Sequence, residues 1–200
     1  MNEDSPPVLT EIKDAVAILR FCRPQQRNPL SFATLEALRQ ITSQLISRVD
    51  IQALIFTGTA DVFASGANIR ELAQLDSETA LRFSKLGQEL FQSLADSEKL
   101  TIAAINGYCM GGGLDLALAC DIRVASTTAI FSHPGARLGI ITGWGGTQRL
   151  PQIIGRARAI ELFTTARRID SVEAMSINLV TQAKDPVLAC ALEISQAHHK

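Results

Sequence analysis

The sequence has little of what marks several broad classes of protein. Its 19 basic and 20 acidic side chains nearly cancel, leaving a net charge of -1. Proteins that bind nucleic acid or an anionic membrane surface carry an excess of positive charge, which is missing here. Long unbroken apolar runs, which a membrane-spanning helix requires, are also missing. We therefore expect neither a nucleic acid nor a membrane as partner.

Cysteines are few and widely separated, and the N-terminus carries no targeting signal. Neither the density of a disulfide-rich secreted domain nor the close pairs of a zinc site is present in Cys22, Cys109, Cys120 and Cys190. The first seven residues are acidic and polar, whereas a signal peptide begins with positive charge and continues with an apolar run. These features predict reduced thiols in a cytoplasmic protein.

Motifs for metals, nucleotides and serine hydrolases are also missing. His133 stands alone, and His198 and His199 lie at the end of the chain, so no metal-binding cluster is expected. The sequence contains no phosphate-binding Gly-x-x-x-x-Gly-Lys-Ser/Thr loop, no dinucleotide-binding Gly-x-Gly-x-x-Gly and no Gly-x-Ser-x-Gly elbow. These absences argue against phosphate-loop and serine-triad chemistry.

What is present is an alternation of apolar strands and amphipathic helices, in a chain that is 46% hydrophobic. Compact apolar runs predict strands, and apolar residues at steps of three and four predict helices. The expected strands span 14–22, 51–57 and 101–105, and the expected helices span 31–49, 80–94 and 186–197. The alternation indicates one α/β domain over residues 1–200, because no linker or repeat divides it.

Most of the thirteen glycines lie in the second and third quarters of the chain, and six of them form two clusters. One cluster, residues 111–113, directly precedes a run of good helix formers, Leu114 to Ala119. Free backbone amides at the N-terminus of that helix would face outward and stabilise a developing negative oxygen. Glycine clusters also form ordinary tight turns, so this pattern alone leaves both interpretations open.

Four segments, in order along the chain, resemble the crotonase superfamily, the enoyl-CoA hydratase/isomerase group. They are residues 63–72 (FASGANIREL), 103–122 with the run NGYCMGGGLDLALACDI, 138–151 (LGIITGWGGTQRLP) and, more weakly, the loop 23–30. The resemblance implies a spiral of ββα units, a homotrimer or hexamer, and an acyl-CoA thioester substrate of fatty acid metabolism. It also implies that two backbone amides, those of Ala67 and Gly112, hold the thioester oxygen. No separate cofactor is implied, because coenzyme A is part of the substrate.

The resemblance assigns the remaining substrate contacts by position. The loop for adenine and pantetheine holds Gln25, Gln26 and Arg27, and Arg70 matches a basic position that contacts coenzyme A phosphates in some relatives. The other expected contacts around the thioester and acyl group are Ser65, Asn68, Ile69, Gly111, Pro134, Gly135, Leu138, Thr142, Gly143 and Trp144. Arg70 is equally well explained as a solvated side chain, and Trp144 as a core residue.

The chemical groups are fewer than in hydratases of this family, which use two glutamates. Their positions, three and twenty-three residues after Gly112, hold Asp115 and Gly135, and a third acid position holds Gly143. Asp115 is therefore the expected proton-transfer group, although a carboxylate in the first turn of a helix is also common for electrostatic reasons alone. His133 either replaces the missing acid or is a histidine bonded near a strand end, and the second interpretation is favoured.

These observations predict an acyl-CoA enzyme of the hydratase/isomerase type that stabilises a thioester enolate. A single acid fits isomerisation or decarboxylation better than hydration, because decarboxylation needs only the oxyanion hole and one proton donor. The alternatives are therefore an acyl-CoA decarboxylase or a non-catalytic acyl-CoA-binding protein. Relatives continue for several helices beyond the region of residues 168–180, and these helices are expected to be largely absent here.

Overall fold

The computed structural model describes residues 6–197. Residues 1–5 of the acidic N-terminal segment and the terminal pair His198 and His199 lie outside the described residues. No helix of residues 6–197 combines the length and hydrophobicity that a bilayer crossing requires. The four cysteines are all free thiols.

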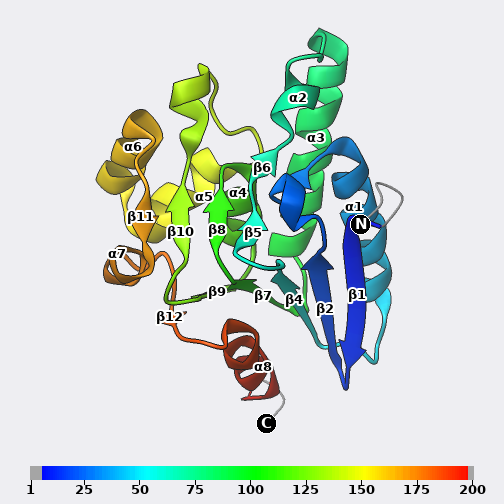
Figure 1. Cartoon of the computed structure of the whole chain (residues 1–200). Helices are drawn as coiled ribbons and strands as arrows, with labels where there is room; N and C mark the ends of the chain where they lie inside the picture. The colour runs from blue at the N-terminus through cyan, green and yellow to red at the C-terminus, as the bar shows by residue number, and fades with distance from the viewer. Residues whose placement is uncertain (1–5, 198–200) are drawn as a thin grey trace.

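Two larger sheets and a two-stranded one organise the chain (Figure 1). The six-stranded sheet has the order β1 (Val8–Lys13), β2 (Val16–Phe21), β4 (Ala53–Thr57), β7 (Leu100–Ile105), β9 (Ile122–Ala125) and β12 (Gln182–Ala183). The four-stranded sheet has the order β11 (Ile169–Asp170), β10 (Ile130–Ser132), β8 (Tyr108–Met110) and β5 (Val62–Ala64). Strands β3 (Pro29–Leu30) and β6 (Gly66–Ala67) form the small parallel pair.

The chain repeats one unit, in which a strand of the six-stranded sheet is followed by a strand of the four-stranded sheet and then by a helix. The three units are β4, β5 and α3 (Ser77–Ala95), then β7, β8 and α4 (Gly112–Ala119), then β9, β10 and α5 (Gly146–Ile154). Equivalent strands of successive units pair in parallel. The α/β class and the spiral of ββα units are therefore confirmed.

Most expected elements are present, because their local signals agree with their packing. The helix α1 (Phe32–Ser47) begins after Ser31, whose hydroxyl accepts a hydrogen bond from the Thr34 amide, as an N-cap does. Strand β1 was not expected, because it is an edge strand whose residues after Val8 are all exposed. Because neither face of this strand is buried beyond Val8, its sequence lacks the regular alternation of apolar and polar residues that would predict a strand.

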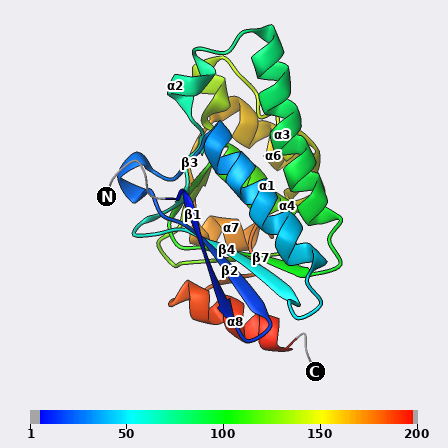
Figure 2. The same cartoon turned by 90° about the vertical axis from the view of Figure 1, so that its right-hand side faces the viewer.

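The helix α8 (Val187–Ala197) covers the outer face of the six-stranded sheet, as Figure 2 shows below β2 and β4. Alternate strand residues such as Ile18, Ile55 and Ile102 face this helix, while their neighbours face the main core. The helical spacing of Leu188, Ala191, Leu192 and Ile194 predicts an apolar face that packs on the core or on a neighbouring subunit. In the structure, these side chains pack with the strand residues that face the helix.

Candidate active site

A cavity of about 560 Å³ lies where the second and third units meet the short helix α2 (Ile69–Leu72). Its walls come from β6, α2, α3, the start of α4, the 3-10 helix η2 (Pro134–Leu138) and the loop that leads to α5. Eleven of the residues expected to contact substrate or bind its oxygen line it: Ser65, Ala67, Ile69, Gly111, Gly112, Pro134, Gly135, Leu138, Thr142, Gly143 and Trp144. The resemblance therefore identified residues that share one cavity.

The two segments that carry the expected amide donors approach each other closely. Gly66 packs so closely on the turn before α4 that a Cβ there would lie 2.8 Å from the Gly112 nitrogen. Gly112 is the first residue of α4, so its N–H has no acceptor within the helix. Ala67, the next residue after Gly66, lines the same cavity. This close approach brings the two backbone segments together at the wall of the cavity.

Trp144 belongs to both the core and the cavity wall. Its ring packs in edge-on fashion against Phe83 and Phe91, with centroid distances of 5.1 and 5.7 Å. A Cβ on either Gly87 or Gly112 would collide with the indole, so both glycines make room for it. The two interpretations of this tryptophan are therefore compatible, because one face of a core side chain forms the wall of the cavity.

Asp115 lies just outside the cavity and is completely buried. The Thr142 hydroxyl donates a hydrogen bond to its Oδ2. Its Oδ1 lies 3.3 Å from Nε2 of His133, which is also buried. His133 lines the cavity and packs against the Phe163 ring at a centroid distance of 4.9 Å. His133, for which the sequence favours a structural role, therefore contacts the expected proton-transfer group and also lines the cavity.

The positions without a second acid differ in the room they offer. At Gly135 a Cβ would lie 2.6 Å from the Ile140 carbonyl oxygen, so a side chain requires the backbone to shift. At Gly143 a Cβ would meet only the Ser84 hydroxyl, at 3.4 Å. No Asp or Glu is among the described residues that line the cavity.

Five other expected contacts lie outside the cavity lining. Gln25 and Gln26 belong to the exposed 3-10 helix η1 (Pro24–Gln26), and Arg27 follows it. This loop borders the cavity, because the Ser65 amide donates to the Arg27 carbonyl at 3.0 Å. The Asn68 side chain caps α2 by accepting from the Arg70 amide, and Arg70 is exposed. The Asn68 side chain therefore supports α2, while the exposed loop and Arg70 remain available to a long ligand.

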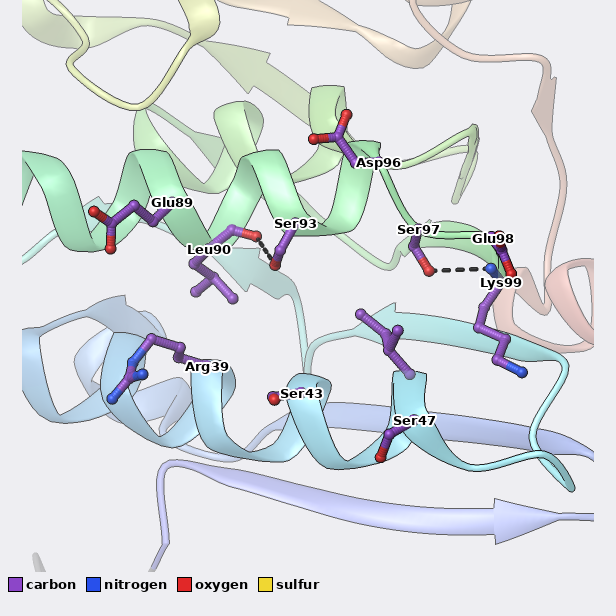
Figure 3. A pocket seen from close by; sticks show the side chains of 11 residues that line it. Arg39, Ser43, Ser47, Glu89, Leu90, Ser93, Asp96, Ser97, Glu98 and Lys99 are labelled. Atoms are coloured by element: carbon purple, nitrogen blue, oxygen red, sulfur yellow. Dashed lines mark hydrogen bonds between the residues drawn. The ribbon is translucent and has the colours of Figure 1, made fainter.

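A second concavity, of about 550 Å³, lies between α1 and the end of α3 (Figure 3). Serines and charged side chains line it, and the hydrogen bonds drawn there are local. The Ser93 hydroxyl donates to the Leu90 carbonyl, and the Lys99 amide donates to the Ser97 hydroxyl. Within residues 6–197, no three His, Cys, Asp or Glu side chains gather as a metal-binding group. We therefore place the candidate active site at the first cavity.

Comparison with known proteins agrees with this geometry. The sequence profile of the family described as Enoyl-CoA hydratase/isomerase matches residues 11–197. The chain belongs to this family. It is 37% identical over 180 residues to the short-chain-enoyl-CoA hydratase of Clostridium acetobutylicum, covering 90% of this chain and 69% of that protein. Identity and coverage are the same for the crotonyl-CoA hydratase of Syntrophomonas wolfei.

The family resemblance extends to the three-dimensional structure. The crystal structure of an enoyl-CoA hydratase from Bacillus anthracis superposes with a TM-score of 0.91 at 34% identity, covering 96% of this chain and 76% of that one. The protein is thus an acyl-CoA enzyme of the enoyl-CoA hydratase/isomerase type, and the crotonase fold is shared over nearly its whole length.

Burial determines where the proton of this family member's acid–base pair resides. It raises the pKa of Asp115 to about 7, although the Thr142 hydroxyl, the Trp144 amide and the charge of Arg149 all lower it. Burial lowers the pKa of His133 to about 4. From pH 4 to 7 the folded pair therefore holds one titrating proton, on Asp115. In the unfolded chain, ordinary pKa values would leave that proton on His133 up to about pH 6.5.

Because the proton is on Asp115 in the folded protein and on His133 in the unfolded chain, two single variants should show opposite pH dependences of stability. In His133→Gln only Asp115 of the pair titrates. Because its pKa is higher in the folded protein than in the unfolded chain, the free energy of unfolding should fall as pH rises from about 4 to 6.5. In Asp115→Asn only His133 of the pair titrates. Because its pKa is lower in the folded protein than in the unfolded chain, the free energy of unfolding should fall as pH drops over the same range. Each slope, relative to the unmodified protein, should be about 1.4 kcal/mol per pH unit. Urea unfolding at several pH values measures both, and slopes of equal sign would contradict the assignment.

Proposed function

We propose that the protein binds an unsaturated acyl-CoA thioester with its acyl group in the apolar cavity and isomerises the double bond through an enolate. The amides of Ala67 and Gly112 donate hydrogen bonds to the thioester oxygen and so stabilise the negative charge that develops on it. In a dry site one such donor contributes about 3 to 4 kcal/mol to the transition state. No separate cofactor takes part, because coenzyme A is carried by the substrate, and the loop of residues 25–27 with Arg70 would contact it.

The observation that favours isomerisation over hydration is the lack of any carboxylate among the described residues that line the cavity. Hydration needs one group to take a proton from water while another delivers a proton to C2. Isomerisation of a 3-enoyl thioester needs only one group, which removes a proton from C2 and returns it at C4. The thioester oxygen holds the electron pair in between. A single acid–base unit built on Asp115 meets this requirement.

A substrate panel tests the proposed reaction. We expect conversion of a 3-enoyl-CoA to its conjugated 2-enoyl isomer, and hydration of crotonyl-CoA at least about 10²-fold slower, because one of the two proton-transfer groups is missing. Absorbance at the conjugated thioester band follows the first reaction, and mass spectrometry detects the added water of the second. Loss of carbon dioxide from a malonyl-type thioester would instead favour the decarboxylase alternative. Rapid hydration would contradict the preference for isomerisation.

Replacing single amides by esters tests the oxyanion hole without changing a side chain. Lactic acid in place of Ala67, or glycolic acid in place of Gly112, exchanges the N–H for oxygen. We expect each replacement to lower kcat about 10²- to 10³-fold with little change in KM. Lactic acid at Ala73 is the matched control, because this amide donates to the Ile69 carbonyl at 3.1 Å and yet borders the same cavity. Equal losses at all three positions would argue against the oxyanion hole.

We also propose that the protein acts in the cytoplasm, in fatty acid metabolism, as a homotrimer or hexamer. The assembly is supported by four apolar side chains that line the cavity and are 47 to 69% exposed: Ile69, Leu138, Ile140 and Ile141. Such an apolar rim is more stable when a neighbouring subunit covers it. Light scattering at low micromolar concentration should give three or six times 21.6 kDa, and the mass of one chain would contradict the proposal.

A further inference from the structure

Two buried polar atoms face each other beside the cavity and have no other partner. Asp115 Oδ1 and His133 Nε2 are the only buried side-chain nitrogen or oxygen atoms of the described residues that lack a hydrogen bond of good geometry. They lie 3.3 Å apart, which is within reach of a shared proton. An unpaired buried polar group is costly, so one proton shared between these two atoms would satisfy both of them at once.

The arrangement around the pair fixes which of the two groups can meet a substrate. The Thr142 hydroxyl occupies the other oxygen of Asp115, and Gly146 packs so tightly on Oδ1 that a Cβ there would collide with it. His133 follows strand β10, whose Ser132 carbonyl accepts from the Gly111 amide at 2.9 Å. The imidazole therefore lines the cavity together with Gly111 and Gly112, whereas Asp115 is not among the lining residues.

We infer that His133 carries protons between the acyl cavity and Asp115, so that the imidazole touches the substrate and the carboxyl is the buried proton store. This inference rests on the proposed enolate chemistry. His133 is then the catalytic residue, and Asp115 acts through it as a positioning residue.

The proton transfer balances within the pair. In the base form, Asp115 is a carboxylate that accepts from Nε2–H, and Nδ1 carries a lone pair. Nδ1 takes the proton from C2 of the thioester while the Nε2 proton moves to Asp115 Oδ1, and the C2 electron pair passes to the thioester oxygen. The imidazole is neutral before and after, now protonated on Nδ1. Returning the proton at C4 reverses both movements and restores the base form.

The charges around the pair support this sequence. Burial keeps the imidazole from becoming an isolated buried cation and holds its pKa at about 4. The carboxyl titrates at about 7, so both of its forms are populated near neutral pH. Two other titratable groups face it. Arg149 on α5 lowers the pKa of Asp115, and the buried Cys109 thiol on β8 has its own pKa raised well above the usual range by burial and by Asp115.

The tautomer of His133 reports the relay directly and without turnover. As pH rises through about 7, ionisation of Asp115 should move the ring proton from Nδ1 to Nε2 while the imidazole stays neutral. Nitrogen NMR of ¹⁵N-histidine-labelled protein distinguishes the two tautomers, and loss of the signals in His133→Gln assigns them. Asp115→Asn should abolish the switch. One unchanged tautomer from pH 5 to 9 would overturn the inference, whatever the outcome for the proposed reaction.

Exchange of the substrate C2 proton with deuterated solvent provides the kinetic test. Exchange by the unmodified protein should rise with pH through about 7, and His133→Gln and Asp115→Asn should each lower it by about 10²-fold or more with little change in KM. Because the two groups act as one unit, the double variant should be no slower than the slower single variant. Asp121→Asn, which removes an acid beyond the other end of α4, is the control and should exchange normally.

The outcomes separate the two proposals. No exchange by the unmodified protein, together with an intact tautomer switch, would contradict the proposed enolate reaction and leave the proton relay standing. If His133→Gln exchanges the C2 proton as fast as the unmodified protein does, the relay is wrong and the proposed enolate reaction is unaffected. Circular dichroism and thermal unfolding identify a variant that fails to fold, in which case the tautomer titration of the unmodified protein decides.

Discussion

The contact on which the site depends is the close approach of two backbone segments, Gly66–Ala67 and the turn of residues 111–113. Gly113 packs so tightly that a Cβ would lie 2.3 Å from the Ala64 carbonyl oxygen, and a Cβ on Gly66 would lie 2.8 Å from the Gly112 nitrogen. Without side chains between them, the strand β6 and the N-terminus of α4 come together as bare backbone. The two amides that could bind an oxyanion are therefore held by packed strands and a helix, which costs little reorganisation during reaction.

The same glycines connect the core to the cavity. Because Gly112 and Gly87 lack side chains, the Trp144 ring fits between α4 and α3 and continues into the aromatic contacts with Phe83 and Phe91. The indole N–H donates to the Phe83 carbonyl at 3.4 Å, so this polar atom is also satisfied. The wall of the cavity is thus as rigid as the core from which it projects, and the space available to an acyl group is set by core packing.

Sequence patterns predicted those features that follow from local rules. The helix after Ser31 and the buried strand of residues 53–57 combine a cap or an apolar run with burial, so periodicity identified them. The glycine turn before α4 and the family motifs led to Ala67 and Gly112. The sequence offered His133 as one possible replacement for the missing acid but favoured a structural role. Its contact with Asp115 could not be predicted, because the two residues are eighteen positions apart and on different elements. Their contact depends on the pairing of β8 with β10, which no local pattern encodes.

The residues that depart from the family's pair of acids are physically connected to one another. Aspartate is one methylene shorter than glutamate, and Asp115 ends at the Thr142 hydroxyl without reaching the cavity. The second acid position cannot simply be filled, because the Ile140 carbonyl occupies the space that a side chain at Gly135 would need. A side chain two residues earlier in the chain, His133, spans the distance that the shortened carboxyl leaves. Because a neutral imidazole has one donor and one acceptor nitrogen, it can do so without placing a second charge in the buried site.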